Sequence, residues 1–179
     1  GANLTGIASD FVKVAETAGG GSGTQAFNGC FTTTYKFYLI MASISLDTTA
    51  QCYVRLQNSS DAEISSGIYY FAGRQNNRTS SSNGGSDMGN WGSTKITVQE
   101  NIQANNPHAS YKLFIFNPTD SNMKTMVHLD YFSQDNSGYQ RQVKVSAVHD
   151  SNANDTGIRF IADSGNIKTT SQFKIFGMK

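Results

Sequence analysis

The sequence predicts an all-β fold, an antiparallel β-sandwich of the jelly-roll type. Runs rich in β-branched and aromatic residues recur at short intervals along the 179 residues, with turn-forming residues between them. No segment keeps apolar residues at helical spacing over three turns. Several runs also alternate apolar and polar side chains, as a strand with one face in solvent requires. A chain of this length fits a single domain of this class.

About ten or eleven strands are expected. In chain order, the strand-like runs cover residues 11–15, 26–32, 35–46, 50–57, 68–73, 94–102, 111–116, 125–132, 142–148, 157–161 and 172–176. The clearest alternation places Val127, Leu129 and Tyr131 against His128 and Asp130. One face of that strand is therefore expected to lie in solvent, and a polar outward stripe explains His128 and Asp130 better than a catalytic pair.

The last 23 residues, 157–179, are expected to form a closing hairpin. Apolar residues alternate with Arg159 in the first segment and with Lys174 in the second, and residues 164–166 (SGN) supply a turn between them. The hairpin would complete the sheet at the end of the chain.

Two glycine-rich segments interrupt the strands. Residues 18–23 (AGGGSG) have the composition of a flexible connection, so residues 1–23 are expected to form an N-terminal arm and residues 24–179 the sandwich domain. A mobile hairpin tip is the alternative for residues 18–23. Residues 75–90 are polar and glycine-rich, and we expect a long surface loop there, either functional or a tolerated insertion.

Two strands are apolar on both faces. Residues 37–41 (FYLIM) and 113–116 (LFIF) carry no alternation, although a two-layer sandwich covers only the inner face of each sheet. Their outer faces are expected to contact another subunit or to be covered by loops of the same chain.

Composition argues against two classes of partner. A formal net charge of +1 and a charged fraction of 15% provide no clustered Lys and Arg for nucleic acid. No apolar run approaches the roughly 20 residues that a transmembrane helix needs. No signal peptide is visible at the N-terminus, although a processed chain would look the same.

Residue patterns for catalysis and for metal binding are weak, and we expect neither an enzyme nor a cofactor. Cys30 and Cys52 lie in apolar runs, typical of buried free thiols rather than of a disulfide, and the three His residues lack metal-ligand spacing to them. Residues 150–157 place oxygen side chains at alternate positions but lack the Gly and Glu of a calcium loop, so a turn is expected. No oriented nucleophile and no pair of carboxylates emerges from the spacing.

One aromatic group suggests a binding role. Trp91 follows the glycine-rich segment, with Tyr69 and Tyr70 upstream. An exposed aromatic here would stack on a sugar, and packing at the edge of the sandwich is the alternative. These three residues are the candidate glycan contacts.

Several ordered pieces of the sequence resemble a family of bacteriophage virion proteins. They are residues 11–17 (FVKVAET), 26–32 (AFNGCFT), 35–40 (YKFYLI), 53–56 (YVRL), 69–72 (YYFA), 113–118 (LFIFNP), 157–167 (GIRFIADSGNI) and 173–179 (FKIFGMK). Proteins that look like this occur in tailed phages, particularly marine and cyanobacterial ones, as virion structural proteins and tail-fibre-like domains. Cys30 stands where the family pattern has Tyr, a departure that bears on packing.

The resemblance implies a non-enzymatic structural protein located in the virion, on the surface of the phage particle. A capsid decoration protein on the head exterior is expected, because the chain is short, with a tail-fibre or receptor-binding module for host surface glycans as the alternative. The implied partners are the major capsid protein and copies of the chain itself, as a trimer or a dimer. Candidate docking or oligomer contacts are Phe11, Val12, Val14, Phe114 and Phe116.

Overall fold

In a computed structural model, residues 10–79, 81–104, 109–134, 138–152 and 154–178 are described. Within these ranges the chain forms twelve β-strands and no helix. The strands are β1 (Phe11–Ala18), β2 (Thr24–Phe27), β3 (Phe37–Ile44), β4 (Ala50–Gln57), β5 (Tyr69–Arg78), β6 (Asn83–Ser93), β7 (Asn101–Ile102), β8 (Ala109–Phe116), β9 (Thr125–Gln134), β10 (Gln140–His149), β11 (Gly157–Ala162) and β12 (Gln172–Met178).

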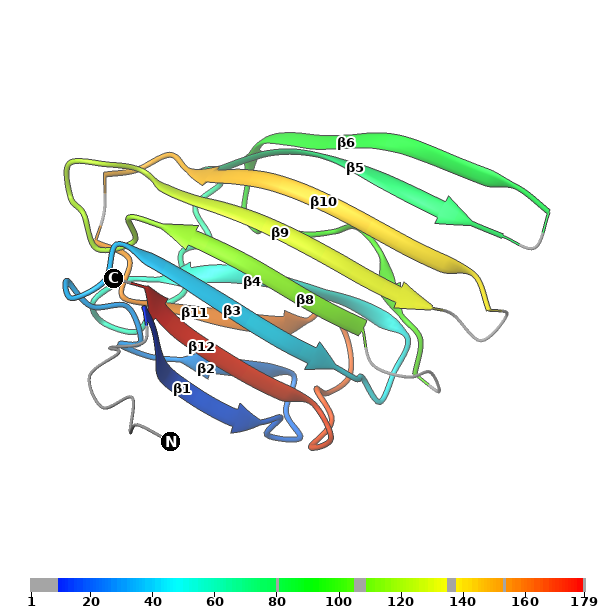
Figure 1. The fold of residues 1–179 in the computed structure, drawn as a ribbon, viewed down its shortest axis with the longest axis horizontal. Coiled ribbons are helices and arrows are strands. Elements are labelled where there is room, and N and C mark those ends of the chain that lie inside the picture. Colours follow the sequence, from blue (N-terminus) through cyan, green and yellow to red (C-terminus); the bar gives the residue numbers. More distant parts are fainter. Residues whose placement is uncertain (1–9, 80, 105–108, 135–137, 153, 179) are drawn as a thin grey trace, which may run out of the picture.

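The strands form two antiparallel sheets, which confirms the expected all-β sandwich. The large sheet has eight strands in the order β1-β12-β3-β8-β9-β10-β5-β6, and the small sheet has four in the order β2-β11-β4-β7. The small sheet lies behind the large one, and the β5–β6 hairpin reaches past it (Figure 1). The large sheet is therefore only partly backed by the small sheet.

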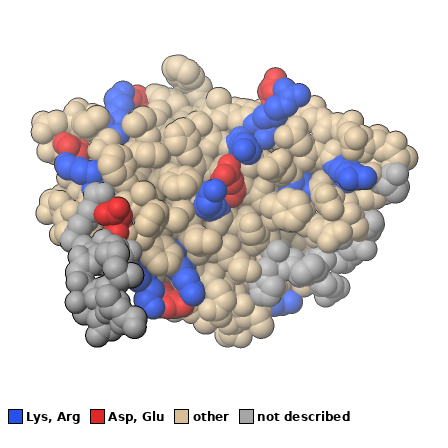
Figure 2. Space-filling model, in the orientation of Figure 1, with Lys and Arg blue, Asp and Glu red and all other residues tan. Residues whose placement is uncertain are grey.

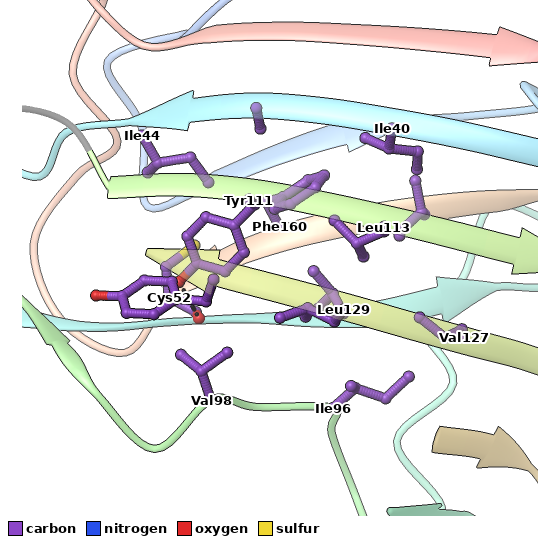
Figure 3. Packing of buried hydrophobic residues seen from close by; sticks show 14 of the residues in the cluster. Ile40, Ile44, Cys52, Ile96, Val98, Tyr111, Leu113, Val127, Leu129 and Phe160 are labelled. Carbon is purple, nitrogen blue, oxygen red and sulfur yellow. Dashed lines mark hydrogen bonds between the residues drawn. The ribbon is translucent and has the colours of Figure 1, made fainter. Parts of the chain in front are cut away.

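The core lies between the sheets because alternate side chains of the large sheet point inward. On β3, Tyr38, Ile40 and Ile44 are fully buried, and the residues between them are more exposed. Inward residues of β8 and β9 meet β11 and β4 of the small sheet around Phe160 and Cys52 (Figure 3). The buried Tyr111 hydroxyl finds a partner there, since it donates to the Cys52 carbonyl at 2.9 Å (Figure 3).

The expected closing hairpin is wrong, because its two strands belong to different sheets. β11 pairs with β2 and β4 in the small sheet, whereas β12 pairs with β1 and β3 in the large sheet. Between them the chain crosses the sandwich, and the fully buried Ile167 makes isolated bridges to Ser22 and Leu46. Alternation predicted both strands correctly but carries no information on which layer each joins.

The described part of the expected N-terminal arm is a strand of the large sheet. β1 pairs with β12 in seven register pairs, with a bulge between Lys13 and Ala15. The glycine-rich segment that follows is held by hydrogen bonds, since Gly19 N donates to Ser171 O at 2.9 Å and Gly21 N to Ile167 O at 3.1 Å. Residues 1–9 of the expected arm lie outside the described residues.

The expected loop at residues 75–90 is also wrong, because the segment forms most of the β5–β6 hairpin. Nine register pairs join these strands, from Tyr69 with Ser93 to Arg78 with Asn83. The hairpin extends beyond the small sheet, so its far end has no apolar core to face (Figure 1). Its sequence is polar for that reason, and the pattern of alternation that identifies a strand is missing.

Candidate functional site

The outer face of the large sheet is the candidate site. Among the described residues, no second layer of strands covers this face (Figure 1). The face carries large apolar side chains in contact with solvent. Phe37, Met126 and Phe132 are exposed by 41%, 43% and 47% of their surface. Exposed apolar area gathered on one face is typical of a binding surface.

Strand register aligns the outward apolar residues in rows across the sheet. One row runs over six neighbouring strands through Met178, Phe37, Phe116, Met126, Val148 and Tyr70. The next row adds Phe176, Leu39 and Phe114 on three of those strands. We call these nine residues, together with Trp91, the apolar band.

Aromatic contacts hold the band in shape. Phe37 and Phe116 meet edge to face with ring centroids 5.5 Å apart. At the other end, Trp91 stacks on Tyr70 with centroids 4.9 Å apart and is itself 85% exposed. The band therefore ends in an exposed indole ring that stacks on Tyr70.

A row of charges borders the band. Successive strands place Lys174, Met41, Lys112, Asp130, Lys144, Arg74 and Asp87 in one line. Lys112 Nζ lies 3.5 Å from an Asp130 oxygen, and Arg74 Nη1 lies 3.2 Å from Asp87 Oδ1. In the space-filling view, charged side chains form a line across a face that is otherwise largely uncharged (Figure 2). Such exposed pairs add little stability.

Beyond the charged row, the outer face carries a polar depression of about 610 Å³. Its described lining comes from β5, β6, β9 and β10: Arg74, Asn76, Asn77, Arg78, Asn83, Gly84, Gly85, Phe132, Gln140 and Gln142. Amide and guanidinium groups dominate it, with one exposed aromatic ring. We call it the polar depression.

The candidate docking residues divide between the two faces of the large sheet. Phe114 and Phe116 lie half-buried in the outward rows, and Phe11 is 45% exposed at the end of β1. Val12 and Val14 are half-buried on the inward side, where Val12 pairs with the buried Gly177 and Val14 packs against the core. These two valines therefore lie on the opposite face of the large sheet from Phe114 and Phe116, because the inner side of β1 faces the sandwich.

The candidate glycan contacts lie on opposite faces of the large sheet. Trp91 and Tyr70 form the exposed end of the apolar band, so Trp91 is not packed into the sandwich edge. Tyr69 is fully buried, and its hydroxyl accepts from Leu56 N and donates to Ile64 O, both at 3.0 Å. Tyr69 therefore does not contact a ligand at the surface, since adjacent residues of a strand point to opposite faces.

Among the described residues, the His and Asp side chains considered for catalysis lie apart or are buried. His128 contacts Ser146 Oγ at 2.9 Å, whereas the nearby Asp130 pairs with Lys112. His149 and Asp155 do lie together, with Nδ1 2.9 Å from Oδ2, but their side chains are 1% and 0% exposed. A substrate has no access to that pair in the described structure.

Metal ligation and thiol chemistry find little support in the described part of the chain. No group of three His, Cys, Asp or Glu side chains is placed to hold a metal ion there. Cys30 and Cys52 are free and buried, as expected, and burial raises the pKa of each thiol to about 12. The described ranges also hold no helix with the length and apolar character needed to span a membrane.

Sequence reasoning missed the polar depression and four members of the apolar band: Met126, Val148, Phe176 and Met178. Six of the ten described lining residues of the depression, Asn76 and Arg78 among them, lie in the segment 75–90 that was expected to be a loop. Met126 and Phe132 carried a signal, because both occupy outward positions of a strand whose alternation was clear. An apolar residue at a position expected to face solvent indicates a contact surface.

Comparisons with known proteins found no relative. The sequence matches no protein-family model, and no curated protein or solved structure was found to resemble it. Function is therefore inferred from the geometry of the outer face, together with the sequence resemblance described above.

Proposed function

We propose that the chain is a non-enzymatic structural protein of a phage virion, a capsid decoration protein on the exterior of the head. The observation that carries this proposal is the apolar band on an uncovered sheet face. Water contact with Phe37, Met126 and Trp91 is unfavourable, at roughly 25 cal/mol for each Å² of apolar surface. A partner surface that covers the band gains that free energy.

The size of the band indicates what kind of partner fits. Nine strand positions, each about 4.8 Å by 7 Å, give an area of roughly 300 Å². A stable pairwise interface needs about 800 Å² on each partner. The band supplies less than half of that, which favours a partner lattice that offers many equivalent sites, with the charged row and neighbouring copies adding the remainder.

Strand order supports the same proposal. The large sheet begins with the order β1-β12-β3-β8 and the small sheet has the order β2-β11-β4-β7, so these eight strands alternate between the two layers along the chain, except that β4 and β7 share the small sheet. We infer from this order a jelly roll extended by the β5–β6 and β9–β10 hairpins. Jelly rolls build viral capsid and lectin domains, an analogy at the level of fold.

The proposed partner is the major capsid protein, with copies of this chain as neighbours. The band would bury against an apolar patch of the shell, and Lys112, Asp130 and Lys144 in the adjoining row would set its orientation. Association should then be fast and dependent on salt, whereas retention should depend on the apolar contacts.

A tail-fibre or receptor-binding role is the second candidate. Its support is Trp91, which is 85% exposed and stacked on Tyr70, an arrangement suited to a sugar ring. In that case the apolar band would bind host surface glycans rather than the shell.

The test is the location and the contact surface of the chain on the particle. We expect a cryo-EM map of the virion to place the chain on the head with the outer face of the large sheet toward the shell. Purified chain should rebind to particles that lack it, and Met126→Lys should abolish rebinding. Met123→Lys is the matched control, because Met123 is 47% exposed but lies in the turn before β9, outside the apolar band and the charged row.

The outcomes separate the two candidates. Density on the tail, with loss of glycan binding in Trp91→Ala, would replace decoration by receptor binding. Full rebinding by Met126→Lys would remove the apolar band from the docking surface.

A further inference from the structure

The polar depression has the chemistry of a saccharide site, at the end of the outer face away from the apolar band. We propose that it binds an acidic oligosaccharide, one that carries a carboxylate or a phosphate. The proposal adds a second binding surface to the one inferred for docking, and it rests on different residues.

The lining matches the hydrogen-bonding needs of sugars. Each hydroxyl of a sugar both donates and accepts, and the side-chain amides of Asn76, Asn83, Gln140 and Gln142 offer a donor and an acceptor side by side. A depression lined mainly by amides is poorly suited to an apolar ligand, since these groups would lose their water without replacement. A polyhydroxyl ligand replaces those hydrogen bonds.

An aromatic ring completes the site. Phe132 lines the depression, is 47% exposed, and pairs in register with Gln142, which in turn pairs with Asn76. The carbon-bound hydrogens of a pyranose make one face of the sugar apolar, and that face packs on an aromatic ring while the hydroxyls reach the amides. The three residues lie on neighbouring strands in one row, as an extended ligand requires.

Glycine keeps this row open. Gly85 faces Asn76 across the β5–β6 pair, and a Cβ on Gly85 would lie 2.9 Å from Gln75 O and 3.1 Å from Asn76 Oδ1. A side chain there would displace the Asn76 amide and fill the row. Glycine at position 85 therefore has a structural reason.

Charge selects an acidic ligand. Arg74 is paired with Asp87 at the rim, whereas Arg78 has no ion-pair partner among the described residues. The described lining contains no Asp or Glu, so an incoming acid meets an amide-rich surface with an exposed guanidinium, a group that can bind a carboxylate or phosphate through two hydrogen bonds. Short nucleic acids share the negative charge but need stacked aromatics and several cations, and this lining offers one ring and two arginines.

The experiment measures binding of full-length chain to defined probes by titration calorimetry. The probes are polygalacturonate oligomers for the carboxylate, phosphomannan oligomers for the phosphate, dextran oligomers as neutral saccharides, and a ten-residue oligothymidylate. We expect binding to a carboxylated or phosphorylated saccharide, whichever acid the site prefers, and at least tenfold weaker binding to dextran and oligothymidylate. Arg78→Gln should weaken the acidic saccharide at least tenfold, and Phe132→Ala at least fivefold.

Lys112→Gln is the matched control, because it removes one positive charge from the same sheet face outside the depression. It should change saccharide affinity less than twofold, and thermal unfolding should show that all variants fold. Binding that is confined to dextran or to oligothymidylate, no saccharide binding at all, or an equal effect of Arg78→Gln and Lys112→Gln would overturn the proposal. Arg78→Gln should still rebind to particles, because docking depends on Met126 in the apolar band and not on the polar depression. This measurement separates the saccharide site from the docking face.

Discussion

The carboxylate of Asp155 lies 2.9 Å from the imidazole of His149, and both side chains are sealed within the sandwich. Asp155 also accepts from Thr125 Oγ1 at 2.5 Å, and its backbone N–H donates to Pro118 O at 2.7 Å. The pair therefore ties the segment before β11 to the ends of β9 and β10. The outward neighbours of Thr125 and His149 along their strands are Met126 and Val148, two members of the apolar band. The buried contacts of Asp155 therefore lie directly beneath that part of the band.

Replacement of Asp155 should destabilise the fold strongly. In Asp155→Ala the buried imidazole and the Thr125 hydroxyl lose their acceptor, and breaking a buried pair of this kind costs about 3–5 kcal/mol. Urea unfolding followed by far-UV circular dichroism measures the loss, and circular dichroism is preferable to fluorescence because Trp91 is 85% exposed.

Asp163→Ala is the control for this measurement. Asp163 is 56% exposed in its side chain and lies 3.4 Å from Lys95, so its loss should cost less than about 1 kcal/mol. Equal effects of the two variants would show that the His149 contact contributes no more than a surface pair.

Alternation along the strands made the sandwich predictable from the sequence. Val127, Leu129 and Tyr131 alternate with polar residues and are buried in the structure, because the inner face of β9 meets the core. The pattern does not specify partners: Phe160 and Phe173 were placed in one hairpin, although β11 and β12 lie in different sheets and their rings meet across the core, 5.1 Å apart. Layer assignment depends on contacts distant in sequence, and periodicity contains none of them.

The functional surfaces were harder to predict than the core. Phe114 and Phe116 were found because a strand that is apolar on both faces is unusual, whereas Arg74, Asn76 and Arg78 were hidden in a segment without apolar residues. A strand with both faces wet has the composition of a loop. Only its pairing with β10, which has ten register pairs, identifies it as part of the sheet.

That pairing makes Gly73 a sensitive position in β5. A Cβ on Gly73 would lie 2.3 Å from Lys144 O and 3.1 Å from the Cα of Val145, both in the backbone of β10. Gly73→Ala should therefore lower the free energy of unfolding by about 1–3 kcal/mol, because the strands must separate to admit the methyl group.

Gly84→Ala is the matched control on the neighbouring strand. A Cβ there meets no atom within 4 Å, so the variant should stay within about 0.5 kcal/mol of the parent. Thermal unfolding of the two variants compares them directly. A tolerant Gly73 would show that the β5–β10 pairing is looser than described.

The two thiols should be inert in the folded protein. Burial raises the pKa of Cys30 and of Cys52 to about 12, so at pH 8 only about one thiol in 10⁴ is the reactive thiolate. With Ellman's reagent at pH 8 we expect no release of colour from native protein and two equivalents in urea. Rapid reaction of one equivalent under native conditions would reveal local opening near that cysteine.

Glu63 should make stability depend on pH in the acid range. Burial acts to raise the pKa of Glu63, but hydrogen bonds from Arg55 at 2.8 Å and Arg159 at 2.7 Å, with their charges, hold it below the ordinary value of 4.5. The folded state therefore binds the proton less readily than the unfolded state. The stabilisation from Glu63 is complete above about pH 4.5 and is lost as pH falls through the lower, folded pKa.

Comparison of the parent with Glu63→Gln tests that sign. At pH 6 the parent should be more stable by about 1 kcal/mol, since the Glu63 side chain is 24% exposed and bridges two arginines. The difference should shrink steadily between pH 4.5 and pH 2.5 in urea unfolding series. A difference that grows as the pH falls would mean that burial, rather than the arginines, determines the protonation of Glu63.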